Sequence, residues 1–209
     1  MEEIRFHGRG GQGTVVAAIL MAKAFFKAGL WVQTFPLFGV ERRGAPVEAY
    51  LRLDQKKIQV RCNIYTPDHV VVQDAKLLST VDITAGLKPG GWVLLNARQV
   101  PENLKPFAGF RLAWVDATQI AVKYGLGTRT HPMINTAMVG AFAGLLKKPP
   151  LADVVGAIGE EIAVKTEHNV LAAREAYETV CVHGKVLEAD DIKANPIKDI
   201  PIDDFHGNQ

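Results

Sequence analysis

Short apolar runs alternate with longer segments of helical length along most of the chain. The short runs are rich in apolar or β-branched residues, a composition typical of strands. We expect strands at residues 3–7, 30–35, 69–73, 92–95 and 112–115. The longer segments predict helices at residues 15–27, 117–124, 135–146, 151–158 and 166–182, with further helical segments between residues 73 and 92. Strands that alternate with helices predict a mostly parallel sheet with its ligand site at the carboxyl ends of the strands.

Two segments depart from this alternation. Residues 48–53 and 58–61 alternate in polarity around a turn at residues 54–57, which predicts an antiparallel hairpin with one face in solvent. Beyond Gly184 the apolar periodicity ends. We therefore expect one α/β domain over residues 1–184, a Rossmann-like, doubly wound, mostly parallel sheet with an antiparallel hairpin. An extended C-terminal tail over residues 185–209 is expected to follow it.

Single residues mark helix ends and packing sites. Asp116 can cap the helix that follows it, and Asn135 is first a candidate N-cap, with a ligand contact as the alternative. Gly140 and Gly144 lie inside a predicted helix, where glycine indicates close packing.

Composition excludes several classes of function. The chain has 24 basic and 22 acidic residues, so no overall field would attract nucleic acid or an anionic membrane. The start of the sequence lacks the pattern of a signal peptide, and no apolar run has membrane-spanning length, which predicts a cytoplasmic protein. Cys62 and Cys181 lack metal-binding spacing and are expected to be buried, inert thiols, so we expect no metal site from this chain alone.

A glycine-rich turn carries the main chemical signal. The segment Gly8-Arg9-Gly10-Gly11-Gln12-Gly13-Thr14 fits GxGxxG, follows a predicted strand and opens a predicted helix. Glycines allow a tight turn and close approach of a ligand, and free amides at a helix start favour phosphate. The segment therefore predicts a phosphate-binding loop, to which the side chains of Arg9 and Thr14 could add contacts. The alternative is a strand-to-helix turn that binds nothing.

Two common nucleotide-binding mechanisms fit this loop poorly. A nicotinamide site should have an acidic residue at the end of the second strand, but residues 32–36 contain none, and the first carboxylate afterwards is Glu41. The segment also lacks the Gly-Lys-Ser/Thr ending of a triphosphate-binding P-loop. Phosphate binding therefore remains the favoured prediction, while NAD binding and nucleotide hydrolysis are disfavoured.

Two motifs in order, GRGGQGT at residues 8–14 and FPLFGVERRGAP at residues 35–46, resemble the gamma subunits of 2-oxoacid:ferredoxin oxidoreductases, the pyruvate synthase group. The resemblance covers roughly residues 3–182. It continues through Arg52, Ile58 and Arg61 and through residues 67–72, 115–118 and 135–140. The family's usual Arg-Ala-Gly-Gln-Gly is here RGGQG at residues 9–13, which keeps the turn chemistry.

The resemblance implies a subunit of an enzyme that converts a 2-oxoacid and coenzyme A into an acyl-CoA and carbon dioxide. It implies thiamine diphosphate and [4Fe-4S] clusters in partner alpha, beta and ferredoxin-like delta subunits, with electrons passing to ferredoxin or a similar external acceptor. The ERRGAP form at residues 41–46 resembles pyruvate-type chains, so pyruvate is the expected substrate. Branched-chain and aryl 2-oxoacids remain alternatives.

The resemblance also implies roles for individual residues, none of them catalytic. The loop facing the phosphates of coenzyme A would consist of Gly8, Arg9, Gly10, Gly11, Gln12, Gly13 and Thr14. Arg42 and Arg43 would pair with coenzyme phosphates or with carboxylates of a neighbouring subunit. The apolar and proline residues around them predict that this loop is buried against a partner.

Other interpretations remain at this point. His7 and His131 could be acid–base groups, although structural roles are favoured for both. A stand-alone coenzyme-binding module would carry the same glycine loop without chemistry. An independent NAD-dependent dehydrogenase is disfavoured because the chain shows no identifiable proton-transfer pair.

Overall fold

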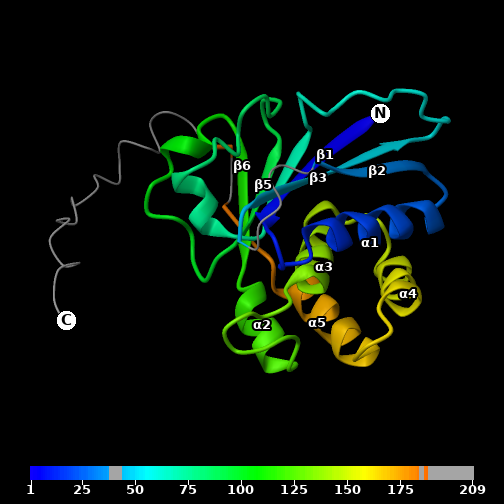
Figure 1. Cartoon of the computed structure of the whole chain (residues 1–209). Coiled ribbons are helices and arrows are strands. Elements are labelled where there is room, and N and C mark those ends of the chain that lie inside the picture. The colour runs from blue at the N-terminus through cyan, green and yellow to red at the C-terminus, as the bar shows by residue number, and fades with distance from the viewer. Residues whose placement is uncertain (38–43, 184–185, 188–209) are drawn as a thin grey trace, which may run out of the picture.

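The computed structural model describes residues 1–37, 44–183 and 186–187, which form a sheet covered on one face by helices (Figure 1). The sheet has seven strands in the order β2-β3-β1-β4-β5-β6-β7. Their bounds are β1 Glu2–Arg9, β2 Trp31–Leu37, β3 Pro46–Asp54, β4 His69–Val72, β5 Trp92–Asn96, β6 Arg111–Val115 and β7 Cys181–Val182. Within the described residues, no helix combines the length and the apolar character needed to cross a membrane.

Most strands of the sheet point the same way. Strands β1, β4, β5 and β6 form a parallel ladder, β3 pairs antiparallel with both β1 and β2, and β7 pairs antiparallel with β6. Five strands therefore run in one direction, and only β3 and β7 run in the other. The predicted α/β class with a Rossmann-like, mostly parallel sheet is confirmed.

The predicted antiparallel hairpin is correct in kind but wrong in its partners. Residues 58–61 are not a strand and are mostly exposed. Strand β3 instead pairs with β2 on one side and β1 on the other, so the hairpin is β2–β3. An alternating segment fits any antiparallel neighbour, and β2 offers a longer ladder than residues 58–61 could.

Five α-helices pack on one face of the sheet (Figure 1). Their bounds are α1 Thr14–Lys27, α2 Ala117–Lys123, α3 Asn135–Leu146, α4 Leu151–Glu161 and α5 Thr166–Thr179. Asp116 caps α2 as expected, because its Oδ1 accepts a hydrogen bond from the Gln119 amide at 2.8 Å. Asn135 is not an N-cap: it is the first helical residue of α3, and Ile134 holds the cap position.

The two helical glycines are positions of close contact between α3 and α5. A Cβ at Gly140 would lie 2.0 Å from the Ala173 carbonyl oxygen, and a Cβ at Gly144 would lie 2.3 Å from that of Tyr177. Both obstacles are backbone atoms, which side-chain rotation cannot move. The prediction of tight packing at these glycines is confirmed.

The opposite face of β4, β5 and β6 has its own apolar cluster. Successive residues alternate between the two faces, so Val71 and Leu94 face the helices while Val70 and Val93 face the second cluster. This cluster is covered by 3₁₀ turns at Ala75–Ser79 and Lys105–Phe107, and Leu187 is buried in it. The segment between β4 and β5 thus contains a short 3₁₀ turn rather than the predicted helices.

Two further sequence-based expectations differ from the structure. Helix α5 ends at Thr179 rather than at residue 182, because the β-branched and cysteine residues that follow pair with β6 as β7. Cys62 and Cys181 are exposed free thiols rather than buried ones. The predicted tail, residues 185–209, lies outside the described residues except for 186–187.

Candidate functional site

The glycine loop joins the carboxyl end of β1 to the start of α1. Gly11 has a φ of +96° and Gly13 a φ of +76°, values that residues with a Cβ rarely adopt. Gly8 has no space for a side chain, because a Cβ there would lie 2.0 Å from Thr14 Oγ1. The three positions therefore need glycine for two different reasons, conformation at Gly11 and Gly13 and close packing at Gly8.

Two helix N-termini meet at this loop. A Cβ at Gly13, the N-cap of α1, would lie 2.9 Å from Nδ2 of Asn135, the first residue of α3. Neither helix has an acidic residue in its first turn to neutralise its dipole. Within the described part of the chain, the main-chain N–H groups of Gly11, Gly13 and Thr14 have no hydrogen-bond partner. The loop thus has unpaired amide donors beside two positive helix ends, an arrangement that suits an anion.

The Thr14 side chain is buried inside the protein rather than exposed at the loop. It is 3% exposed, and its hydroxyl donates to Gln73 Oε1 at 2.7 Å. Gln73 is fully buried, and its Nε2 has no partner in the described structure. What Thr14 offers to a ligand is therefore its main-chain N–H, while its hydroxyl fixes the base of the loop to the end of β4.

The segment before β3 is bonded directly to the glycine loop. The Gly10 amide donates to the Ala45 carbonyl oxygen at 2.9 Å, and the Gly44 amide donates to the Gly10 carbonyl oxygen at 3.3 Å. Arg9 Nη1 also donates to the Gly44 carbonyl oxygen at 3.1 Å. The two sequence motifs therefore meet in space at Gly44. Arg42 and Arg43, which were predicted to bind here, lie outside the described residues.

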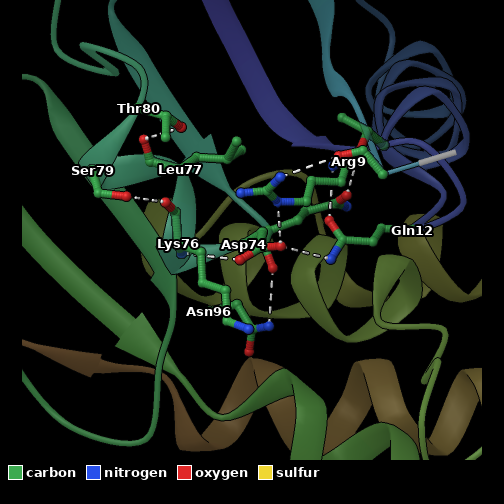
Figure 2. Close-up of polar contacts among 11 residues, drawn as sticks. Arg9, Gln12, Asp74, Lys76, Leu77, Ser79, Thr80 and Asn96 are labelled. Carbon is green, nitrogen blue, oxygen red and sulfur yellow. Dashed lines mark hydrogen bonds and ion pairs between the residues drawn. The ribbon is translucent and has the colours of Figure 1, made fainter. Parts of the chain in front are cut away.

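A carboxylate at the end of β4 organises the loop's side chains (Figure 2). Asp74 Oδ2 accepts hydrogen bonds from Arg9 Nε at 2.9 Å and from Gln12 Nε2 at 3.2 Å. Gln12 Oε1 in turn accepts from the Arg9 amide at 2.8 Å. Asp74 Oδ1 caps the following 3₁₀ turn by accepting from the Lys76 amide at 2.9 Å. Arg9 and Gln12 are thus held in one network with the neighbouring strand.

A second polar link joins the next two strand ends. Asn96, the last residue of β5, donates through Nδ2 to the Gln73 carbonyl oxygen and to Thr118 Oγ1, both at 3.0 Å. Thr118 lies in the first turn of α2. Asn96 therefore joins the ends of β4 and β5 to the start of α2, and its amide is engaged within the protein.

Residues 9–12 of the glycine loop line a cavity of about 500 Å³. Gly44, Asn96 and Thr118 also line it. A tight turn at residues 127–132, closed by an isolated bridge between Gly127 and Pro132, contributes further lining residues. As the parallel sheet predicts, the cavity lies at the carboxyl ends of the strands.

The two histidines of interest differ in environment. His7 is 2% exposed on the face of the sheet opposite the helices, and burial lowers its pKa to about 4, with Glu48 opposing this shift and Arg5 adding to it. It is therefore neutral at pH 7, as a structural residue would be. His131 is exposed and lines the cavity, with its Nδ1 3.0 Å from Thr130 Oγ1.

Sequence reasoning found the glycine loop but not its surroundings. Asp74, Asn96 and Thr118 were not singled out, although Asp74 and Asn96 lie where predicted parallel strands end, which was the available signal. The acidic residue expected of a nicotinamide site would follow the second strand of the chain. The parallel neighbour of β1 is β4, and the carboxylate that follows it already bonds Arg9 and Gln12.

Comparison with known proteins identifies the family. Residues 3–179 match the family described as pyruvate ferredoxin/flavodoxin oxidoreductase. The chain is 49% identical over 195 residues to the pyruvate/ketoisovalerate oxidoreductases common subunit gamma of Thermococcus kodakarensis, an alignment that covers 88% of this chain and 99% of the relative.

Solved structures agree in fold. The pyruvate oxidoreductase subunit PORC of Thermotoga maritima is 34% identical, with a TM-score of 0.73 and coverage of 87% of this chain and 97% of that one. A 2-oxoglutarate:ferredoxin oxidoreductase from Magnetococcus marinus, with 2-oxoglutarate, coenzyme A and succinyl-CoA bound, is 21% identical with a TM-score of 0.65. It matches 85% of this chain with 30% of its own and is evidence of the fold alone.

Proposed function

The chain belongs to the pyruvate ferredoxin/flavodoxin oxidoreductase family as a gamma-type subunit, and on this basis we propose that its glycine loop binds the phosphates of coenzyme A in a multi-subunit 2-oxoacid oxidoreductase. The complete enzyme converts a 2-oxoacid and coenzyme A into an acyl-CoA and carbon dioxide. The single observation that carries the proposal is the set of loop amides, beside the starts of α1 and α3, that have no hydrogen-bond partner among the described residues.

The chemistry of the cavity suits a phosphorylated coenzyme. At its wall the Gly11 amide is a donor for phosphate oxygens, and the Arg9 guanidinium adds a positive charge. The Gly13 and Thr14 amides are further donors at the start of α1. Arg42 and Arg43 are proposed as further phosphate or subunit contacts from the sequence alone.

Substrate, cofactors and partners follow from the relatives rather than from this chain. Pyruvate is the proposed 2-oxoacid, because both a pyruvate/ketoisovalerate relative and a pyruvate oxidoreductase subunit match over nearly their full lengths. Thiamine diphosphate and [4Fe-4S] clusters are proposed to lie in alpha, beta and delta partner subunits, with ferredoxin or a similar acceptor receiving the electrons. A cytoplasmic location and a boundary between domain and tail at residue 184 remain predictions.

A matched pair of substitutions tests the proposed loop function. At Gly11 a Cβ would meet no atom within 4 Å, and asparagine and aspartate are the residues that best tolerate a positive φ. Gly11→Asp and Gly11→Asn therefore differ mainly in charge. In the assembled enzyme, purified without oxygen, KM for coenzyme A should be at least about tenfold higher with Gly11→Asp than with Gly11→Asn.

The assay is coenzyme A-dependent oxidation of pyruvate with a viologen dye. KM for pyruvate should be equal in the two variants, because the added charge lies at the loop and not at the reacting carbonyl group. Equal KM values for coenzyme A in the two variants would show that the loop does not face its phosphates.

A further inference from the structure

Asp74 links two strand ends at the point where the sheet changes its winding direction. From β1 the chain crosses through α1 toward β2, whereas from β4 it continues toward β5 on the other side. The crevice at such a point is where α/β sheets commonly bind ligands. Strands β1 and β4 pair in parallel up to His7 and Val72. Asp74, two positions beyond Val72, therefore reaches the loop after β1. Its carboxylate bonds Arg9 and Gln12 there (Figure 2).

The Arg9 guanidinium is fixed on two sides. Its Nε donates to Asp74 Oδ2 at 2.9 Å, and its Nη1 donates to the Gly44 carbonyl oxygen at 3.1 Å. Because the group is planar, two bonds from different atoms determine its orientation. Nη2 has no partner among the described residues, and Arg9 lines the cavity with a side chain 29% exposed. The fixed Arg9 guanidinium therefore keeps N–H donors available at the cavity wall.

We propose that Asp74 is a positioning residue, which orients Arg9 and Gln12 so that the guanidinium meets a phosphate of the coenzyme. This inference rests on the proposed function of the glycine loop and adds a residue to it. Asp74 is 15% exposed in its side chain and acts through Arg9 rather than on the ligand. If the carboxylate served only as a nearby negative charge, its removal would strengthen anion binding. A positioning role predicts the opposite result, that removal of the carboxylate weakens anion binding.

Asp74→Asn separates the two roles of this side chain, which caps the 3₁₀ turn and orients Arg9. Asparagine is as good an N-cap as aspartate, so its oxygen can still accept from the Lys76 amide. Its amide nitrogen then faces Arg9 Nε and Gln12 Nε2, which are donors, and both bonds are lost. The 3₁₀ turn is retained while the orientation of Arg9 is released.

The experiment measures steady-state kinetics of the complete enzyme with Asp74→Asn. KM for coenzyme A should rise about tenfold. The kcat at saturating coenzyme A and KM for pyruvate should each stay within about twofold. In the double variant with Arg9→Met, Asp74→Asn should cause no further rise, because the group that it positions is gone. A purely structural defect would lower kcat or yield and would persist in the Arg9→Met background.

Asp82→Asn is the matched control. Its Oδ1 also accepts from a nearby backbone amide, that of Thr84 at 3.1 Å, but it is exposed and makes no bond to the glycine loop. The KM for coenzyme A of the Asp82→Asn enzyme should equal that of the unmodified enzyme. An unchanged or lower KM with Asp74→Asn overturns the positioning role, whatever the Gly11 pair shows. Equal KM values in the Gly11 pair overturn the proposed loop function instead, so the two failures are distinguishable.

Discussion

His7 is a buried base whose neutral form the fold favours. Burial, the largest cause, lowers its pKa from 6.5 to about 4; Arg5 adds to this effect and Glu48 opposes it. Between these two values the unfolded chain binds more protons than the folded one, so stability falls as pH decreases. We expect the free energy of unfolding to drop by up to about 3 kcal/mol from pH 7 to pH 4 because of this residue. Chemical denaturation of the purified chain at several pH values would measure it.

Replacement of His7 isolates its contribution from those of the carboxylates. His7→Gln cannot titrate, so the stability of this variant should depend less on pH between 6.5 and 4 than that of the original chain. Parallel stability curves for the two chains over this range would contradict the lowered pKa.

Arg52 is a fully buried cation that holds the antiparallel side of the sheet together. It is 1% exposed and donates to Glu3 Oε1 at 2.7 Å, to Gln33 Oε1 at 3.0 Å and to the Asn63 carbonyl oxygen at 3.2 Å. Arg52→Met would leave the Glu3 carboxylate without its partner and should cost about 3–5 kcal/mol of stability. Urea denaturation would measure the loss.

The double variant Glu3→Gln, Arg52→Met tests the cause of that loss. It should be more stable than Arg52→Met alone, because no unpaired charge remains near the core. If the free energy of unfolding falls by the same amount in both variants, the loss comes from lost packing of the arginine side chain rather than from the uncompensated carboxylate.

Helix packing gives a prediction at the scale of elements. Gly140→Ala would push a Cβ into the Ala173 backbone and should separate α3 from α5, at a cost of about 2–3 kcal/mol. Gly159→Ala is the matched control, since Gly159 lies in α4 with nothing within 4 Å of the added Cβ. The control should gain about 0.5–1 kcal/mol from helix propensity. Equal effects in thermal denaturation would contradict close packing at Gly140.

Local patterns predicted the elements better than their partners. The GxGxxG spacing found the loop between β1 and α1 because the whole motif lies within one turn. Alternation at residues 48–53 correctly indicated an antiparallel strand, but its place between β2 and β1 depends on pairings between distant segments. Asp74 and Asn96 were missed for the same reason: they reach the site only after β1, β4 and β5 assemble in order.

At the scale of the whole molecule, the site lies at one edge of the sheet, built from the glycine loop and the ends of β4 and β5. A relative of near full-length similarity is named as a gamma subunit common to pyruvate and ketoisovalerate oxidoreductases. If this chain supplies the coenzyme loop while other subunits select the 2-oxoacid, the two binding energies should be independent.

The Gly11→Asp variant tests this division of roles. It should raise KM for coenzyme A by the same factor, within about twofold, whether the purified complex oxidises pyruvate or 3-methyl-2-oxobutanoate. The ratio of kcat/KM values for the two 2-oxoacids at saturating coenzyme A should not change, because the added charge contacts neither. If that ratio shifts with the loop charge, the gamma chain takes part in substrate selection, and residues at the cavity wall such as His131 become the first positions to substitute.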